Sequence, residues 1–197
     1  QLQFEPFADD YFKSVQTYNR LMLSTEFYER FLSYEYLLIY QLDAFVFRDE
    51  LLEWCNKGYD YIGAPWRVVE DAYIDPFGNH QRVGNGGFSL RSQKILTTPK
   101  KVEIPWEVNK SDFYKHMNAN NYAEDGNICV HNRHLFIAEG VKFAPLEVAL
   151  DFSVEQKTLE YKGQATFGFH KTLPNHQEYL KDKVLRALFR IERQLRK

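Results

Sequence analysis

The run from Tyr36 to Phe47 constrains the fold of this chain more than any other stretch. It reads Tyr-Leu-Leu-Ile-Tyr-Gln-Leu-Asp-Ala-Phe-Val-Phe, with one carboxylate, Asp43, between apolar and aromatic residues. Such a continuous run predicts a strand buried on both faces of a sheet. Ligands of open α/β sheets bind beyond the carboxyl ends of strands, so Asp43 is well placed for chemistry. A buried carboxylate needs a cation or several N–H donors beside it. Capping of the next turn is the other reading of Asp43, and the residues leave both open.

Composition places this strand in a globular domain. The chain has 197 residues, which is enough to bury one core, and 44% of them are hydrophobic. The formal net charge of −2 gives no support for nucleic-acid binding. Aromatic residues reach 16%, which suits rings that line a carbohydrate site and equally suits ordinary packing.

The two cysteines bear on the compartment. Cys55 lies in a helix-like stretch and Cys129 in an apolar one, and two scattered cysteines do not form a disulfide framework. Free thiols favour a reducing compartment. No apolar run approaches the ~18 residues that span a bilayer, and no signal peptide is visible. We therefore expect a cytoplasmic protein.

The first half of the chain alternates helical and strand-like patterns. Apolar residues recur at helical spacing from about residue 7 to residue 31, with a break near Ser24, which can cap a second helix. A short helix is expected from Glu50 to Asn56, with Asp49 as its N-cap and Gly58 beyond its end. A strand ending in a Gly/Pro turn follows at residues 59–66. This strand–helix–strand order suggests a βαβ unit and an α/β fold.

A long polar loop at residues 67–83 leads into a glycine-rich segment. The segment is Gly84-Asn85-Gly86-Gly87, and a strand from Phe88 to Arg91 follows it. The glycines would let backbone approach a phosphate or a sugar closely. However, their spacing matches neither common phosphate-binding motif. A tight bend before the strand is the alternative. Ser92 can cap the next helix, which runs through Leu96.

Acidic and imidazole side chains follow in the second half. Glu124-Asp125 precedes an apolar helical run, so the pair either starts a helix or supplies a general base at a cleft. Residues 144–152 read as a late strand. Glu155 is interpreted, like its acidic neighbours at 147 and 151, as solvated or structural. His170 is either a packed histidine or a metal ligand that partners Asp43.

The C-terminal stretch differs in charge from the rest. Residues 177–197 combine an apolar stripe with a basic face, which predicts an amphipathic helix. Such a helix would suit peripheral contact with an anionic membrane. The alternative is a helix docked on the core with a solvated basic face. We accordingly divide the chain into a domain at residues 1–174 and a basic amphipathic helix at 175–197.

Five segments together resemble a known family. They are Gln41–Phe47, Tyr59–Trp66, Gly84–Arg91, Glu124-Asp125 and Phe167–His170. In this order they look like a family formerly described as a domain of unknown function, which itself resembles glycosyltransferases of the GT-A fold. The resemblance implies a GT-A-like, Rossmann-like mixed sheet flanked by helices. GT-A domains place two or three nucleotide-binding strands before the metal-binding strand. We therefore expect such strands to lie upstream of this chain, and the alternative is that its site is reduced.

The resemblance also implies roles for individual residues. Asp43 is similar to the metal-binding acid of an Asp-x-Asp motif, although Gln41 stands where the first Asp would be. His170 resembles the late histidine that completes the shell of Mn²⁺ or Mg²⁺. Asp125 resembles the base that deprotonates the acceptor hydroxyl, with Glu124 as its acidic neighbour. The donor- and acceptor-binding residues that it implies are Gln41, Trp66, Asn85, Gly86, Gly87 and Phe88.

These roles lead to a functional hypothesis and two alternatives. The first is a metal-dependent, hexosyltransferase-like enzyme that moves a sugar from a nucleotide-sugar donor to a glycan, polysaccharide or lipid-linked acceptor hydroxyl, with inversion. It requires Asp43, Asp125 and His170 to converge on one cleft. The second is a non-catalytic carbohydrate- or partner-binding domain on a degenerate GT-A scaffold, which Gln41 favours. A metal-dependent phosphoester hydrolase ranks last, because it would need more clustered Asp and His residues.

Overall fold

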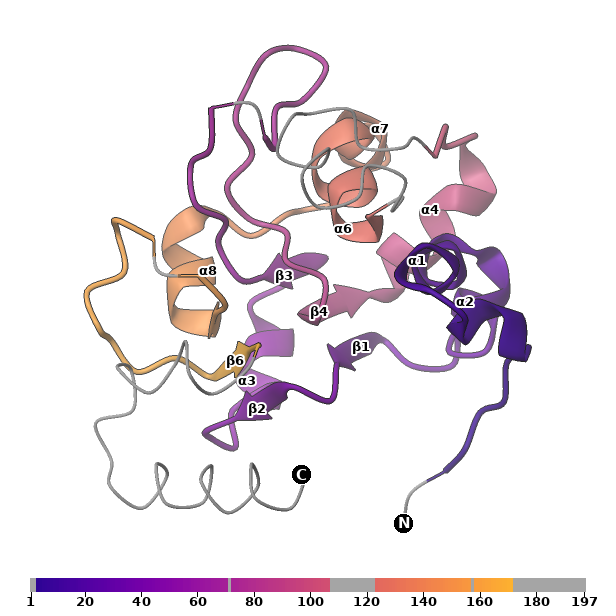
Figure 1. The fold of residues 1–197 in the computed structure, drawn as a ribbon, viewed down its shortest axis with the longest axis horizontal. Helices are drawn as coiled ribbons and strands as arrows, with labels where there is room; N and C mark the ends of the chain where they lie inside the picture. Colours follow the sequence, from indigo (N-terminus) through magenta and orange to yellow (C-terminus); the bar gives the residue numbers. More distant parts are fainter. Residues whose placement is uncertain (1–2, 71, 107–122, 157, 172–197) are drawn as a thin grey trace.

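The computed structural model describes residues 3–70, 72–106, 123–156 and 158–171. Helices surround two three-stranded sheets, so the expected mixed α/β class is confirmed (Figure 1). The basic C-terminal helix expected at 175–197 lies outside the described residues. No helix among the described residues is both long enough and apolar enough to cross a membrane.

The first sheet has the order β1-β4-β3. Strands β1 (Tyr36–Tyr40) and β3 (Tyr61–Gly63) both pair antiparallel with β4 (Phe88–Ser92), which lies between them. The expected βαβ unit is therefore modified: its two strands run in the same direction, but β4 separates them. All five residues of β4 are buried, because this strand is the centre of the sheet.

The second sheet has the order β2-β6-β5. Strand β2 (Ala44–Val46) pairs antiparallel with β6 (Gly168–His170), which pairs parallel with β5 (Ser153–Val154). The single strand expected from Tyr36 to Phe47 is thus wrong. Residues 41–43 form a turn, which the bond from the Ala44 N–H to the Gln41 carbonyl closes at 2.9 Å, and the chain passes from one sheet to the other there.

The helices before and after β1 follow their capping residues. After a 3₁₀ turn (Asp9–Phe12), α1 (Val15–Leu23) and α2 (Thr25–Glu29) meet at Ser24, whose hydroxyl accepts the Phe27 N–H at 3.1 Å. The predicted break at Ser24 is confirmed. Helix α3 (Leu51–Asn56) has Glu50 at its N-cap rather than Asp49, and Gly58 ends it with φ +71°.

The second half is more helical than expected. Helix α4 (Gln93–Lys101) begins at the Ser92 cap, as predicted. The later helices are α6 (Glu124–Gly126), a π-helix (Asn127–His131), α7 (Arg133–Ala138) and α8 (Leu146–Phe152). The late strand expected at 144–152 is wrong, because α8 occupies most of it. Its buried residues, Ala149 and Phe152, are three apart and so lie on one helical face.

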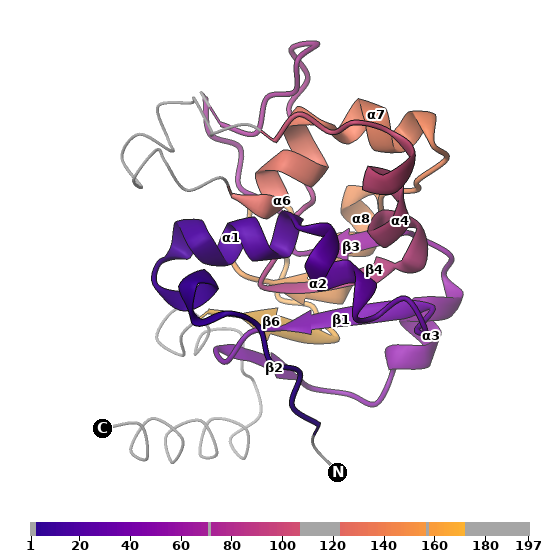
Figure 2. The ribbon, with the colours of Figure 1, turned by 90° about the vertical axis from the view of Figure 1, so that its right-hand side faces the viewer.

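The two sheets share one aromatic core. Phe88 of β4 stacks on Phe152 and contacts Phe167, while a second cluster gathers around Tyr61 and Trp66. Figure 2 shows α1 and α2 above β1, with β2 below that strand and β6 at about the same height as β1. The turn at 41–43 therefore lies where the two sheets adjoin.

Candidate functional site

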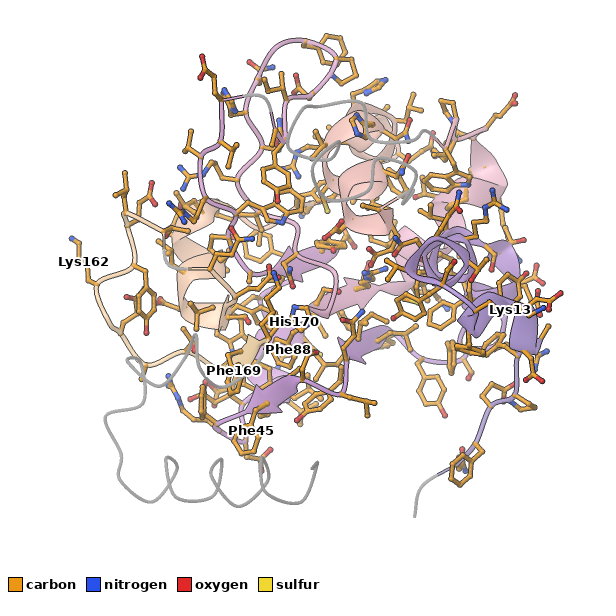
Figure 3. All side chains as sticks on the ribbon, in the orientation of Figure 1. Lys13, Phe45, Phe88, Lys162, Phe169 and His170 are labelled. Atoms are coloured by element: carbon orange, nitrogen blue, oxygen red, sulfur yellow. The ribbon has the colours of Figure 1, made fainter. Side chains whose placement is uncertain are left out.

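The turn after β1 brings the two predicted metal ligands together. Ala44 lies opposite His170 in the β2–β6 register, so the side chains of Asp43 and His170 meet at the end of this pair. His170 Nε2 lies 3.2 Å from Asp43 Oδ1 and 3.0 Å from Gln41 Oε1. Figure 3 shows His170 in the interior, close to Phe88 and Phe169. Three residues that sequence reasoning grouped are thus neighbours in space.

The chemistry of these three atoms fits a small divalent cation. Adjacent ligand atoms around an octahedral ion with bonds of 2.0–2.1 Å are about 3 Å apart, which matches both separations. Two oxygens facing one ring nitrogen also need a proton or a cation between them. Among the described residues, no group of three or more His, Cys, Asp and Glu is arranged to hold a metal. The amide oxygen of Gln41 would therefore be the third protein ligand.

Tyr18 of α1 determines which way the Gln41 amide can face. The Gln41 Nε2–H donates to the Tyr18 hydroxyl at 3.3 Å, and this leaves Oε1 directed at His170. Burial raises the pKa of Tyr18, so its hydroxyl stays protonated near neutral pH. Gln41 thus presents its amide oxygen to the His170 ring.

Glu155 is a site residue that the sequence did not reveal. It was expected to be solvated or structural, but it is buried directly after β5, and its Oε1 lies 3.6 Å from His170 Nδ1 and 2.7 Å from Lys171 Nζ. Its other oxygen accepts the Asn85 amide. Burial alone would raise the pKa of Glu155, but His170 and Lys171 outweigh it and lower the pKa. Only the parallel β5–β6 pairing, which no local pattern shows, could have indicated this position.

The acidic pair lies at the start of α6, against the glycine-rich segment. Asp125 accepts the Gly86 N–H at 3.1 Å and the Gly126 N–H at 2.7 Å. Burial and the charge of Glu124 raise the pKa of Asp125 to about 8. Glu124 is instead paired with Arg91 Nη2 at 2.5 Å. The two acids therefore differ. The charge of Glu124 is compensated by the Arg91 guanidinium, whereas the pKa of Asp125 lies near neutral pH, so Asp125 can exchange a proton there.

The Gly86-Gly87 dipeptide separates the two groups of side chains. A Cβ at Gly87 would collide with the His170 ring and the Gln41 amide, and a Cβ at Gly86 would collide with the Glu124 carboxylate. Neither glycine has a positive φ, so close approach is the reason for both. The side chains of Gln41, Asp43 and His170 are called the cation side, and those of Glu124 and Asp125 the acid side. The cation side adjoins Gly87 and the acid side adjoins Gly86.

Two residues of the predicted binding set belong to the core. The Trp66 ring is 2% exposed and stacks on Tyr73 with centroids 4.2 Å apart, and Phe88 is fully buried. Neither ring offers a face to a sugar, so we remove both from the set. Asn85 remains in it: the residue is 5% exposed, and among the described residues its Oδ1 has no hydrogen-bond partner.

Comparison with known proteins gives one match. No curated protein and no solved structure matches the chain. A family model with the description "Protein of unknown function (DUF5672)" matches residues 1–170, a range that contains the site residues above except Lys171. The chain therefore belongs to the DUF5672 family.

Proposed function

We propose that this protein is a metal-dependent glycosyltransferase with a GT-A-like fold, which moves a sugar from a nucleotide-sugar donor to a hydroxyl of a glycan or lipid-linked acceptor. One observation carries the proposal. A set of cation ligands and a proton-exchanging carboxylate lie on the two sides of Gly86-Gly87. Sugar transfer needs both, because negative charge develops on the leaving diphosphate while the acceptor hydroxyl loses a proton.

The cation side would bind the donor. Asp43, His170 and the Gln41 oxygen would hold Mn²⁺ or Mg²⁺, since hard oxygens with one imidazole suit these ions. When bound, the ion would neutralise charge on the diphosphate. Lys171 adds a partly exposed ammonium beside the same ligands, and Glu155 holds it at 2.7 Å. These residues favour an anionic leaving group at this side.

The acid side would activate the acceptor. Asp125 takes the proton of the acceptor hydroxyl while the new bond from that oxygen to the anomeric carbon forms and the bond to the diphosphate breaks. A positioned carboxylate typically contributes 10²–10⁴-fold to such a step. Because the pKa of Asp125 is about 8, the fraction of active base rises with pH through that value. A single base opposite the leaving group favours inversion.

A second candidate is a non-catalytic carbohydrate- or partner-binding domain on the same scaffold. The specific observation that favours it is Gln41, which provides a neutral oxygen where a carboxylate would bind the cation more strongly. This candidate predicts metal-independent glycan binding and no turnover of any nucleotide sugar. The two candidates therefore differ in a measurable requirement for Mn²⁺.

The deciding experiment is a thermal-shift screen of nucleoside diphosphates and nucleotide sugars with and without Mn²⁺. A ligand at 100 times its dissociation constant stabilises the folded state by about 2.7 kcal/mol. We expect a Mn²⁺-dependent shift with one nucleotide, and we expect Asp43→Ala to abolish it. Asp49→Ala is the matched control, because this exposed carboxylate lies on the same segment outside the site. A thermal shift that glycans induce equally with and without Mn²⁺, together with no shift from any nucleotide, would support the binding domain instead.

A further inference from the structure

Arg91 is a fully buried cation that the proposed reaction does not use directly. Its side chain is 0% exposed, and it donates to Glu124 at 2.5 Å, to the Tyr28 hydroxyl at 3.2 Å and to Ser89 Oγ at 3.0 Å. A buried guanidinium needs both charge compensation and hydrogen-bond partners. A single carboxylate would satisfy the charge. The bonds to Tyr28 and Ser89 therefore do more than balance charge: they fix the position of the guanidinium.

The contacts of Arg91 close a ring that contains Asp125. Arg91 Nη2 donates to Glu124 Oε1, and Glu124 Oε2 accepts the Asp125 N–H at 2.6 Å. Asp125 Oδ2 accepts the Gly86 N–H at 3.1 Å, and the Gly86 carbonyl accepts Arg91 Nη2 at 3.5 Å. One nitrogen of Arg91 thus contacts two of the residues that bond to Asp125, namely Glu124 and Gly86.

We propose that Arg91 is the positioning residue for Asp125, which it holds through Glu124 on one side and the Gly86 peptide on the other. Arg91 lies on the central strand β4, which is paired on both edges, so the ring is anchored to the most rigid part of the sheet. Ser89 also helps to fix the Gly86 peptide, because its hydroxyl donates to the Gly86 carbonyl at 3.0 Å. This role rests on the proposed function, in which Asp125 is the base.

Arg91→Lys tests the ring without a substrate. Lysine keeps the charge but has one nitrogen, so it loses the bonds to Ser89 and Tyr28 that hold Nη2 between Glu124 and the Gly86 carbonyl. We expect amide hydrogen exchange at Gly86 to accelerate about tenfold or more, since a charge-assisted bond contributes roughly that factor. We also expect the ¹³C-detected titration of the Asp125 carboxyl to move above about 8, because the Gly86 bond that would be lost lowers this pKa and the less compensated charge of Glu124 raises it. A purely structural Arg91 would lower global stability and leave this titration in place, and that result would overturn the proposal.

Two further variants keep the result decisive. Arg82→Lys is the matched control, because Arg82 also pairs with a carboxylate, Glu160, away from Asp125. It should not change the Asp125 titration. If Arg91→Lys does not fold, Glu124→Gln opens the same ring at nearly constant volume and removes the like charge. Loss of that charge alone lowers the pKa of Asp125, so the readout here is amide exchange at Gly86: it should accelerate as in Arg91→Lys, and an unchanged rate would reject the positioning role.

Failure of the two proposals can be told apart. The exchange and titration measurements need no nucleotide, metal or acceptor, so they decide the role of Arg91 even if the thermal-shift screen finds no donor. Conversely, a Mn²⁺-dependent nucleotide shift together with an unchanged Asp125 titration in Arg91→Lys would keep the transferase proposal and reject the ring.

Discussion

The two sides of the Gly86-Gly87 dipeptide differ in how firmly their charged groups are held. On the acid side, Arg91 and Glu124 are buried, and a closed hydrogen-bonded ring joins them to Asp125 and Gly86. On the cation side, the Asp43 side chain is 35% exposed and lies in a turn between two short strands. A fixed base benefits from preorganisation, whereas an exchangeable ion and its nucleotide need an accessible site. The difference in burial thus matches the proposed roles, in which the acid side holds the base and the cation side binds the ion and the donor.

Substitution of either glycine should have the largest effect and should separate the two sides. Gly87→Ala would drive its Cβ into His170 and Gln41, and Gly86→Ala into Glu124. Overpacking of this kind costs about 1–3 kcal/mol. We expect Gly87→Ala to abolish the Mn²⁺-dependent shift and to preserve the Asp125 titration. We expect Gly86→Ala to preserve the Mn²⁺-dependent shift and to change the Asp125 titration. Chemical unfolding, Mn²⁺ thermal shifts and carboxyl NMR measure these outcomes. If both variants lost both properties, the two sides would form one cooperative unit.

The pH dependence of stability should be the next largest effect. The pKa of Asp125 is raised from 3.8 to about 8, so the folded state holds a proton that the unfolded state releases between these values. This contribution to stability is present below pH 3.8 and is lost as the pH rises through 8. Each pKa unit corresponds to about 1.36 kcal/mol.

The Asp125→Asn variant isolates this term. Relative to the wild type, its Tm should rise by roughly 10–20 °C between pH 4 and pH 8.5, since the shift corresponds to about 5 kcal/mol and 1 kcal/mol shifts Tm by about 2–4 °C at this size. The trend with pH is the test, because the lost hydrogen bonds of the carboxylate displace the whole curve by a constant. A constant Tm difference across this range would show that Asp125 titrates normally.

Local patterns in the sequence predicted much of this architecture. The serine caps at Ser24 and Ser92, the closing glycine of α3 and the strand after the glycine-rich segment follow from short-range rules. The neighbouring positions of Asp43, His170 and Gln41 were implied by the family resemblance. No periodicity could have indicated them, since 127 positions separate Asp43 from His170.

The remaining site residues depend on long-range pairing. Glu155 reaches His170 only because β5 pairs with β6, and Arg91 reaches Glu124 only because α6 packs beside β4. Trp66 is the opposite case: the family resemblance implied a binding role for it, yet its ring is 2% exposed and stacks on Tyr73. Sequence pattern shows which side chains are capable of chemistry, whereas tertiary pairing decides which of them are exposed or charged.

Removal of the Asp43 carboxylate should affect binding far more than stability. Asp43 is partly exposed and lies in a turn, so Asp43→Asn should change Tm by no more than about 2 °C, as partly exposed substitutions usually do. The same variant should lose the Mn²⁺-dependent nucleotide shift. Differential scanning fluorimetry with and without Mn²⁺ gives both values. Retention of the shift would move the cation away from the turn, whereas a large loss of stability without ligand would mean that this side is as firmly held as the other.

The smallest expected effect concerns the loops that flank both sides. Arg82 and Glu160 form two bonds of 3.0 Å that join the loop before the glycines to the loop before β6. The bond from Arg82 lowers the pKa of Glu160 to about 2. The pair therefore stabilises the fold above pH 4.5, and this contribution is lost as the pH falls through 2. Because Glu160 is solvent-accessible, Glu160→Gln should cost less than about 1 kcal/mol at pH 7, and less still in high salt.

This substitution also tests whether the loops influence the site. In Glu160→Gln, the Mn²⁺-dependent shift and the Asp125 titration should both stay at their wild-type values, because neither Arg82 nor Glu160 contacts the cation ligands or the acidic pair. Thermal unfolding at pH 7 and pH 3, in low and high salt, measures the stability term. A change in the Mn²⁺ shift alone would show that the loops help to hold the open cation side. The acid side, with its closed ring around Asp125, should remain insensitive to them.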